Sequence, residues 1–434
     1  MVSILELHRI FLASAGICTD TRKPLPGGIF FALNGPNFNA NAFAAKALGA
    51  GCSHAVVDDP AAVADERFLL VPDALKALQD LAREHRRTFK GPVIGITGTN
   101  GKTTTKELVH AVLAAERPTL ATEGNLNNHI GVPLTLLKLK PEHRIAIIEM
   151  GASKRGDIAE LCAIAEPTHG LITNIGKAHL EGFGSVEGVI ATKTELYEWL
   201  RTHGGTAFVN GDDPLLMAKS EGLARITYGN ADGVDVRGNA VASEEPCMEL
   251  VFDDNHREHG HYHIATQLIG DYNAPNALAA ICIGRHFGVP DELIVGALSN
   301  YVPGNNRSQL KDTDRNRLVL DAYNANPTSM AAALENFAHL NTERKKLVIL
   351  GDMRELGETS RSEHAAIIQL VKRLGLDAVL VGPEFMQAAP EVALRRFPNV
   401  AAAVEALKAA KPTGLLVLVK GSRGVKLEEV VGVL

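Results

Sequence analysis

Short apolar runs alternate with helix-like patterns along most of this sequence. The strand-like runs are residues 92–96, 145–149, 170–175, 206–210, 318–323, 347–350, 378–381 and 415–419. Helical patterns follow most of them, for example over residues 103–113 and 189–200. Alternation of this kind predicts mostly parallel sheets covered by helices on both faces, which is an α/β fold.

The alternation divides the chain into three expected domains. Residues 1–85 predict a small α/β domain, residues 86–302 a central doubly wound domain, and residues 303–434 a Rossmann-like domain. The third domain contains no GxGxxG string, so a dinucleotide site is not supported there. Residues 226–269 are polar and irregular, which predicts an antiparallel hairpin region attached to the central domain. The string YVPGNNRSQL at 301–310 is rich in turn residues and marks the second boundary.

Composition excludes several classes of protein. The net charge is −6 and no Lys/Arg tract stands out, so we expect no nucleic-acid partner and no anionic membrane surface. No apolar stretch reaches about 18 residues, so we expect no membrane insertion. Five cysteines without CxxC spacing are typical of reduced thiols in a cytoplasmic protein. The oligomeric state is not encoded in any readable feature, and we take a monomer as the expectation.

The string TGTNGKTTT at residues 97–105 lies between an apolar run and a helical pattern. A strand, a glycine-rich turn and a helix place several backbone N–H groups where they favour a polyphosphate. Lys102 can reach the β- and γ-phosphates, and the Thr103 hydroxyl can bind Mg²⁺. The strict GxxxxGK[ST] spacing fails because Ile96 stands where glycine is required. A glycine turn capped by threonines is the alternative, but Gly-Lys followed by three threonines favours a P-loop-type ATPase domain.

Polar side chains follow the next strand-like runs, at the strand ends where ligands bind in doubly wound sheets. Glu149 ends one such run and can bind Mg²⁺ directly or through water, although a structural role is equally open. His179 follows the next run, as a turn histidine or as a second ligand for metal or water. Lys193 stands two residues before Glu195 on a helical pattern, and chemistry alone favours a solvated lysine.

Three later segments carry candidate nucleotide contacts. Asn273 and Asn276 lie three residues apart, which suits an adenine edge, although simple N-capping by Asn273 is the alternative. Arg307 lies at the expected domain boundary, where closure can bring it onto phosphoryl charge. The string DAYNANP places Asp321, Asn324 and Asn326 at the end of the third domain's first strand.

The segments at residues 97–103 and 268–284 resemble the corresponding motifs of the Mur ligase family, whose members are ATP-dependent amide-forming enzymes. The resemblance implies ATP and Mg²⁺ as cofactors. It implies nucleotide contacts by Gly98, Thr99, Asn100, Gly101, Lys102, Thr103, Thr104, Asn273, Asn276 and Asp321. It implies metal ligation by Thr103, Glu149, His179 and Lys193, the last as a carbamate formed with CO₂. The implied catalytic residues are Lys102, His179, Lys193 and Arg307.

Other strings are similar to one branch of the family. They are residues 19–43, TEGNLNNHIGVPLTLL at 122–137, residues 172–185, DAYNANPTSM at 321–330 and LGDMRELG at 350–357. This likeness implies that D-alanyl-D-alanine is joined to UDP-N-acetylmuramoyl-tripeptide (UDP-MurNAc-tripeptide) through an acyl phosphate, with residues 1–85 binding the uridine nucleotide and residues 303–434 the dipeptide. The implied substrate contacts are Asp20, Thr21, Arg22, Asn125, Asn127, Asn128, Asn324, Asn326 and Asp352. Asp352 is equally open to a role as a loop cap.

The sequence also departs from the family pattern. Asn39 and Asn41 replace an expected Asp and His, and Ser153-Lys154 stands where Asn-His is frequent, so these residues receive no role. The third residue of the tripeptide, lysine or diaminopimelate, is not readable. Two alternative functions stay open, a folylpolyglutamate synthase-like ligase and an ATP-hydrolysing switch or scaffold. A folylpolyglutamate synthase begins close to its phosphate loop, whereas a whole block precedes the loop here.

Overall fold

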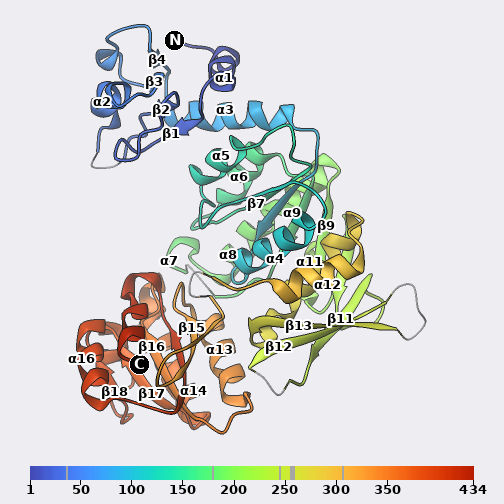
Figure 1. Ribbon diagram of the computed structural model, residues 1–434, viewed down its shortest axis with the longest axis vertical. Coiled ribbons are helices and arrows are strands. Elements are labelled where there is room, and N and C mark those ends of the chain that lie inside the picture. The colour runs from blue at the N-terminus through green and yellow to red at the C-terminus, as the bar shows by residue number, and fades with distance from the viewer. Residues whose placement is uncertain (36–37, 178–179, 244–245, 255–259, 305–306) are drawn as a thin grey trace.

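The computed structural model describes residues 1–35, 38–177, 180–243, 246–254, 260–304 and 307–434. Its strands form three sheets, of four, nine and six strands. Figure 1 shows the sheets in chain order, with the N-terminal part at the top and the C-terminal part at the bottom. This architecture confirms the predicted α/β class with three parts.

The N-terminal sheet is parallel throughout, in the order β1-β2-β3-β4. Its strands are β1 (Ile17–Cys18), β2 (Ile29–Phe31), β3 (His54–Val57) and β4 (Phe68–Leu70). Its helices are α1 (Ile4–Leu12) and α2 (Ala44–Gly49). Helix α1 begins after Ser3, whose hydroxyl accepts the N–H of Glu6 and so caps the helix.

Helix α3 (Ala74–Thr88) connects the N-terminal sheet to the central one. Its Leu78 and Leu81 belong to one apolar core with Leu7 of α1 and with Leu136 and Ile158 of two central-domain helices. The helix runs across residue 85, where the sequence places a boundary. Because a helix of the N-terminal part and two helices of the central part all pack on α3, the division at residue 85 stays a prediction.

The central sheet has the order β13-β12-β11-β10-β9-β8-β5-β7-β6. Its strands are β5 (Val93–Thr97), β6 (Thr119–Ala121), β7 (Ile145–Glu149), β8 (His169–Ile172), β9 (Thr206–Asn210), β10 (Ala224–Gly229), β11 (Val236–Val241), β12 (Cys247–Asp253) and β13 (His261–Ile269). Neighbours from β6 to β11 pair in parallel, and β11, β12 and β13 pair antiparallel. The antiparallel region is therefore confirmed from β11 on, whereas residues 226–229 belong to the parallel strand β10, and the region extends the parallel sheet directly.

The helices of this part are α4 (Lys102–Ala114), α5 (Gly131–Leu136), α6 (Asp157–Ala165), α7 (Leu180–Phe183), α8 (Val186–Lys193), α9 (Glu195–His203), α10 (Pro214–Lys219), α11 (Ala274–His286) and α12 (Asp291–Asn300). The helical pattern at residues 189–200 is confirmed, but it is divided into α8 and α9 at Thr194. The Thr194 hydroxyl donates to the carbonyls of Ile190 and Ala191, a type of back-bonding that bends helices. Lys193 is consequently the last residue of α8.

The C-terminal sheet has the order β14-β15-β19-β16-β17-β18. Its strands are β14 (Gln309–Asp312), β15 (Arg317–Asp321), β16 (Lys345–Gly351), β17 (Asp377–Val381), β18 (Arg395–Phe397) and β19 (Leu415–Lys420), with helices α13 (Pro327–His339), α14 (Ser360–Arg373), α15 (Pro383–Gln387) and α16 (Val400–Ala410). Val348 and Leu350 pack in one core, and Leu347 and Ile349 pack in another on the opposite face. Both faces are covered, as the Rossmann-like prediction requires.

Polar side-chain contacts, including the following two, join the central part to the C-terminal part. Asn326 Nδ2 donates to Asn100 Oδ1 at 2.7 Å, and Lys177 Nζ lies 2.9 Å from Glu363 Oε1. All five cysteines are free thiols. Among the described residues, none of the helices combines the length and the apolar character needed to cross a membrane.

Candidate active site

A cavity of about 1000 Å³ lies where the central and C-terminal parts meet. Its wall includes the ends of β7 and β8, the start of α4 and α11, the segment before β14, and the ends of β15 and β19. Carboxyl ends of parallel strands from two sheets therefore face one space, which is where ligands bind in open α/β sheets.

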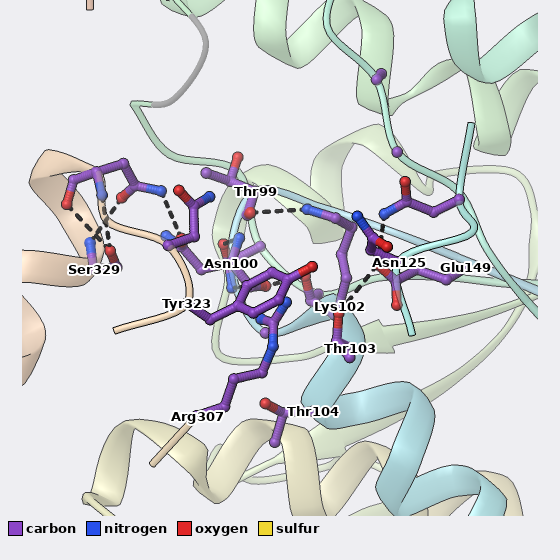
Figure 2. Close-up of a pocket in the computed structure, with 18 of the residues that line it drawn as sticks. Thr99, Asn100, Lys102, Thr103, Thr104, Asn125, Glu149, Arg307, Tyr323 and Ser329 are labelled. Carbon is purple, nitrogen blue, oxygen red and sulfur yellow. Dashed lines mark hydrogen bonds between the residues drawn. The ribbon is translucent and has the colours of Figure 1, made fainter. Parts of the chain in front are cut away.

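The phosphate loop forms one side of this cavity (Figure 2). Gly98 has a φ of +140°, and a Cβ there would lie 2.0 Å from Thr173 Oγ1. Gly101 has a φ of +79°, and a Cβ there would lie 2.6 Å from Asn276 Oδ1. Both positions require glycine, because the backbone is left-handed and a neighbour is too close. Helix α4 begins immediately after Gly101, so its free N–H groups face the cavity.

Lys102 lies folded over the loop. Its Nζ donates to the carbonyls of Gly98 at 2.8 Å and Thr99 at 3.0 Å. Burial lowers the pKa of this amine, Glu149 raises it, and the positive charge of Arg307 lowers it. A bound polyphosphate would supply negative charge to balance the positive charges of Lys102 and Arg307.

Glu149, at the end of β7, is 1% exposed. Its Oε1 accepts the Thr103 hydroxyl at 3.2 Å and Asn127 Nδ2 at 2.8 Å. Its Oε2 is buried and has no hydrogen-bond partner among the described residues. A buried carboxylate oxygen without a partner, beside a hydroxyl at the phosphate loop, fits a hard divalent cation.

Lys193 ends α8 with 3% exposure. Burial lowers the pKa of its amine well below the ordinary value, and the charge of Lys102 lowers it further. The described residues that line the cavity do not include Lys193. Burial contradicts the solvated lysine that chemistry alone favoured. Glu195 accepts the N–H groups of Gly156 and Ala159 at 2.8 and 2.9 Å, so it ties this region to the start of α6.

His179 lies outside the described residues, and its predicted role as a ligand stays a prediction. Among the residues that are described, no group of three or more His, Cys, Asp and Glu side chains is placed to hold a metal ion. The Glu149 carboxylate and the Thr103 hydroxyl lie together at the cavity, and metal binding by them stays a prediction.

Asn273 and Asn276 line the cavity, but their side chains are engaged with each other. Asn276 Nδ2 donates to Asn273 Oδ1 at 2.9 Å, and Thr105 Oγ1 donates to Asn276 Oδ1 at 3.0 Å. Within the described part of the chain, the Asn273 side chain makes no capping bond at α11. The simple N-capping alternative is therefore wrong, and contact with adenine stays a prediction.

Arg307 enters the cavity from the segment before β14 (Figure 2). Its guanidinium lies 3.7 Å from the centre of the Tyr323 ring, a cation–π contact. Asp321 forms an ion pair with Lys420, which is 2% exposed and also lines the cavity. The sequence argument missed Tyr323 and Lys420. Lys420 ends the apolar run of β19, so the strand-end rule that found Glu149 applied to it as well.

Several asparagines predicted to contact substrate also line the cavity: Asn125, Asn127, Asn128, Asn324 and Asn326. Two of them hold local structure. Asn128 Oδ1 accepts the N–H groups of Ile130 and Gly131 at the start of α5. Asn326 caps α13 in a reciprocal capping box with Ser329. Their positions agree with the prediction, and their contacts to substrate stay predictions.

The remaining predicted residues lie away from this cavity. Asp20 and Arg22 form an exposed ion pair after β1, and the hydrogen bonds from Arg22 lower the pKa of Asp20 to about 2. Thr21 lies between them. Asn41, one of the departures from the family pattern, bonds to Asp58 at 2.7 Å. Asp20, Thr21 and Arg22 therefore belong to the N-terminal part, separate from the phosphate loop, and Asn41 is buried there.

Asp352 lies in a second cavity of about 630 Å³ within the C-terminal part. Its oxygens accept the N–H groups of Glu384 and Phe385, each at 3.0 Å, at the start of α15. Burial raises the pKa of this carboxyl, while the two backbone bonds lower it. The geometry favours the loop-cap alternative over direct contact with a dipeptide.

The fold and the cavity define a three-part α/β protein with a phosphate loop at the junction of its central and C-terminal parts. The family model for the Mur ligase middle domain matches residues 96–284, and the model for the Mur ligase glutamate ligase domain matches residues 306–423. These two matches cover more than half of the chain.

Full-length relatives agree with the domain matches. A UDP-N-acetylmuramoyl-tripeptide–D-alanyl-D-alanine ligase of Bacillus subtilis is 35% identical over 96% of this chain and 92% of that protein. A MurF crystal structure from Acinetobacter baumannii has a TM-score of 0.87 at 30% identity, covering 99% of this chain and 98% of that one. A MurF ligase from Thermotoga maritima in complex with ADP has a TM-score of 0.85 at 28% identity, covering 98% and 97%. The chain belongs to the Mur ligase family.

Proposed function

We propose that this chain joins D-alanyl-D-alanine to UDP-MurNAc-tripeptide at the expense of ATP, in the cytoplasm and as a step in peptidoglycan precursor synthesis. The observation that carries the proposal is the cavity itself. It brings the phosphate loop, the unpaired Glu149 oxygen and Arg307 together between two parts of a chain that matches such ligases over nearly its full length.

ATP is proposed to bind along the phosphate loop, with its phosphates on the N–H groups at the start of α4. Lys102 would exchange its bonds to Gly98 and Thr99 for phosphate oxygens, and Thr103 and Glu149 would hold Mg²⁺. The cation would neutralise the charge that develops as the phosphoryl group is transferred. Arg307 points into the same space and would stabilise that group from the other side.

The reaction is proposed to proceed in two steps. The terminal carboxylate of the tripeptide attacks the γ-phosphate of ATP, which releases ADP and leaves an acyl phosphate. The amine of the dipeptide then attacks the acyl carbon, the new amide forms and phosphate leaves. No protein nucleophile is needed, so the contribution of the chain is alignment, charge stabilisation and exclusion of water.

Lys193 is proposed to become a carbamate. Burial and the nearby charge of Lys102 favour its neutral amine, which is the form that reacts with CO₂. The modification would convert this buried neutral amine into an anion with release of a proton, and the carbamate would help to hold a second Mg²⁺ together with His179. The family resemblance implies this role, and the burial of the lysine supports it.

The outer parts of the chain are proposed to hold the two organic substrates. Residues 1–85 would bind the uridine nucleotide near Asp20, Thr21 and Arg22, and residues 303–434 would bind the dipeptide. The tripeptide would then pass Asn125, Asn127 and Asn128 to reach the phosphate loop. Cavity-lining positions support these last contacts.

The test is ADP release across a panel of acceptors and amine donors. We expect turnover only when UDP-MurNAc-tripeptide and D-alanyl-D-alanine are both present, with either the lysine or the diaminopimelate form of the tripeptide. Turnover with a folate substrate would assign the chain to the folylpolyglutamate branch. ATP hydrolysis that is indifferent to both substrates would indicate a switch or scaffold.

A further inference from the structure

A buried chain of hydrogen bonds runs from the phosphate-loop helix to the segment before β14. Thr105 donates to Asn276, Asn276 donates to Asn273, and Asn273 Nδ2 donates to Ser308 Oγ at 3.3 Å. All four side chains are buried. Each of the first three side chains donates a hydrogen bond to the next one, so the four side chains act as one network.

The network begins against the phosphate loop itself. Asn276 Oδ1 lies where a Cβ on Gly101 would be only 2.6 Å away, so the loop and the amide are in close contact. The network ends on Ser308, whose Oγ also lies 3.3 Å from the hydroxyl of Tyr272. Both Tyr272 and Ser308 line the cavity.

Ser308 has an unusual backbone. Its φ is +44°, in the left-handed region that residues other than glycine adopt only at an energetic cost. The residue is 5% exposed and lies between α12 and β14, where the chain leaves the central part for the C-terminal part. Such a conformation persists only when its surroundings hold it, and the described groups that hold the hydroxyl are Asn273 and Tyr272.

The neighbouring residue is Arg307. Its guanidinium stacks on Tyr323 of the C-terminal part, and its buried Nε has no hydrogen-bond partner among the described residues. The side chain is held by an aromatic ring on one side, and it lines a cavity that Lys102 also lines (Figure 2). The backbone that carries it is set by Ser308.

We propose that Ser308 is a positioning residue for Arg307, and that the network Thr105–Asn276–Asn273–Ser308 fixes Arg307 relative to the phosphate loop. The proposal rests on the ligase reaction proposed above, in which Arg307 stabilises the transferring phosphoryl group. It assigns to Asn273 and Asn276 a role that differs from adenine contact. The Tyr323 ring supports the same side chain from the C-terminal part.

The experiment is a double-mutant cycle of Ser308→Gly and Arg307→Lys in the full-length chain. Glycine tolerates the positive φ, so Ser308→Gly removes the hydroxyl while it relieves the strain. We expect kcat to fall about 10- to 100-fold, as misplacement of a catalytic group by about 1 Å can cause. The KM values for ATP and for the two organic substrates should stay within about threefold. In the Arg307→Lys background, Ser308→Gly should change kcat by less than about twofold.

Two results would overturn the proposal. One is wild-type kcat in Ser308→Gly. The other is an equal loss of kcat in both backgrounds, because additive effects indicate a role independent of Arg307. If Ser308→Gly does not fold, Tyr272→Phe removes the other partner of the hydroxyl and is put through the same cycle. Equal losses of kcat in the two backgrounds would overturn the proposal there too.

Thr266→Val is the matched control. Thr266 is a buried hydroxyl on β13 that donates to the carbonyl of Met248 at 2.7 Å, away from the cavity. It should lower the melting temperature without lowering kcat, and a loss of kcat equal to that of Ser308→Gly would also overturn the proposal. The proposed function is tested separately, by ADP release from the wild-type protein only when both substrates are present. That result does not depend on the behaviour of the Ser308 variants.

Discussion

Asn326 of the C-terminal part donates a hydrogen bond to Asn100 of the phosphate loop, with 2.7 Å between Nδ2 and Oδ1. The same Asn326 caps α13 through its Oδ1. The Asn326 side chain thus caps a helix of the C-terminal part and contacts the phosphate loop of the central part. The structure therefore holds the two walls of the cavity in direct contact, and the two functions of Asn326 can be separated by substitution.

Asn326→Ser should separate them. Serine is as good an N-cap as asparagine, so the free energy of unfolding should change by less than about 0.5 kcal/mol. The shorter side chain does not reach Asn100, so the alignment of the two walls should weaken and kcat should fall. Asn326→Ala, which loses the cap as well, should be less stable by about 1 kcal/mol. Urea unfolding and steady-state kinetics measure the two effects, and unchanged kcat in Asn326→Ser would show that the contact is incidental.

Lys102→Ala should abolish turnover and leave the fold intact. The amine contributes two bonds to loop carbonyls and is otherwise placed for phosphate oxygens. We expect kcat to fall at least 100-fold, a loss of transition-state stabilisation of about 2.7 kcal/mol. Circular dichroism and thermal melts check the fold. A folded Lys102→Ala protein with normal kcat would remove the phosphate-loop assignment.

Lys193→Ala should be nearly inactive, because the proposed carbamate would be missing. A short-chain carboxylic acid supplied in solution should restore part of the activity, since it replaces the lost anion. Depletion of CO₂ and bicarbonate should lower the activity of the wild-type protein but leave the acid-rescued variant unchanged. Activity of Lys193→Ala near that of the wild type would instead make Lys193 a structural buried lysine.

Asp352→Ala should destabilise the C-terminal part and leave substrate affinity almost unchanged. The carboxylate accepts two backbone N–H groups at the start of α15, and loss of such a cap costs about 1–2 kcal/mol. Unfolding in urea should report that loss, while the KM for D-alanyl-D-alanine stays within about twofold. A large and selective rise in that KM would restore the earlier interpretation, in which Asp352 lines the dipeptide site.

His169 should make the folded state less stable in mild acid. Burial, together with the neighbouring His286, whose Nε2 lies 3.2 Å from Nε2 of His169, lowers its pKa to about 4. The unfolded chain therefore binds more protons than the folded one between the ordinary value of 6.5 and about 4. Stability should fall as the pH drops through this window. His169→Phe should flatten that dependence in urea unfolding measured at several pH values, and an unchanged slope would contradict the assignment.

The sequence predicted those parts of the molecule that depend on local pattern. The phosphate loop needs glycine at 98 and 101 for backbone reasons, and Glu149 ends an apolar strand, so both could be found without a structure. The break at Thr194 does not follow from local pattern. Helical periodicity continues through it, and only the back-bonding of its hydroxyl to Ile190 and Ala191 shows that the helix divides there.

Contacts between distant segments could not be predicted in this way. Tyr323 stacks on Arg307, and Ser308 binds Asn273, because segments that are separate in the sequence are folded against each other. The hydrogen-bond partners of Asp352 could not be predicted from the sequence either. The sequence motif around Asp352 indicated a substrate-binding loop. Its hydrogen-bond partners, Glu384 and Phe385, instead lie at the start of α15 in the same C-terminal part. A polar side chain in a motif has several partners open to it, and tertiary packing decides among them.

The central claim is that the cavity transfers the γ-phosphoryl group of ATP to the carboxylate of the tripeptide. The most direct test uses UDP-MurNAc-tripeptide with ¹⁸O in its terminal carboxylate, together with ATP and D-alanyl-D-alanine. Mass spectrometry then measures the isotope in the released phosphate. An acyl phosphate intermediate requires one ¹⁸O atom to leave with each phosphate, and we predict that result. Phosphate without ¹⁸O, formed while the amide product accumulates, would contradict the account.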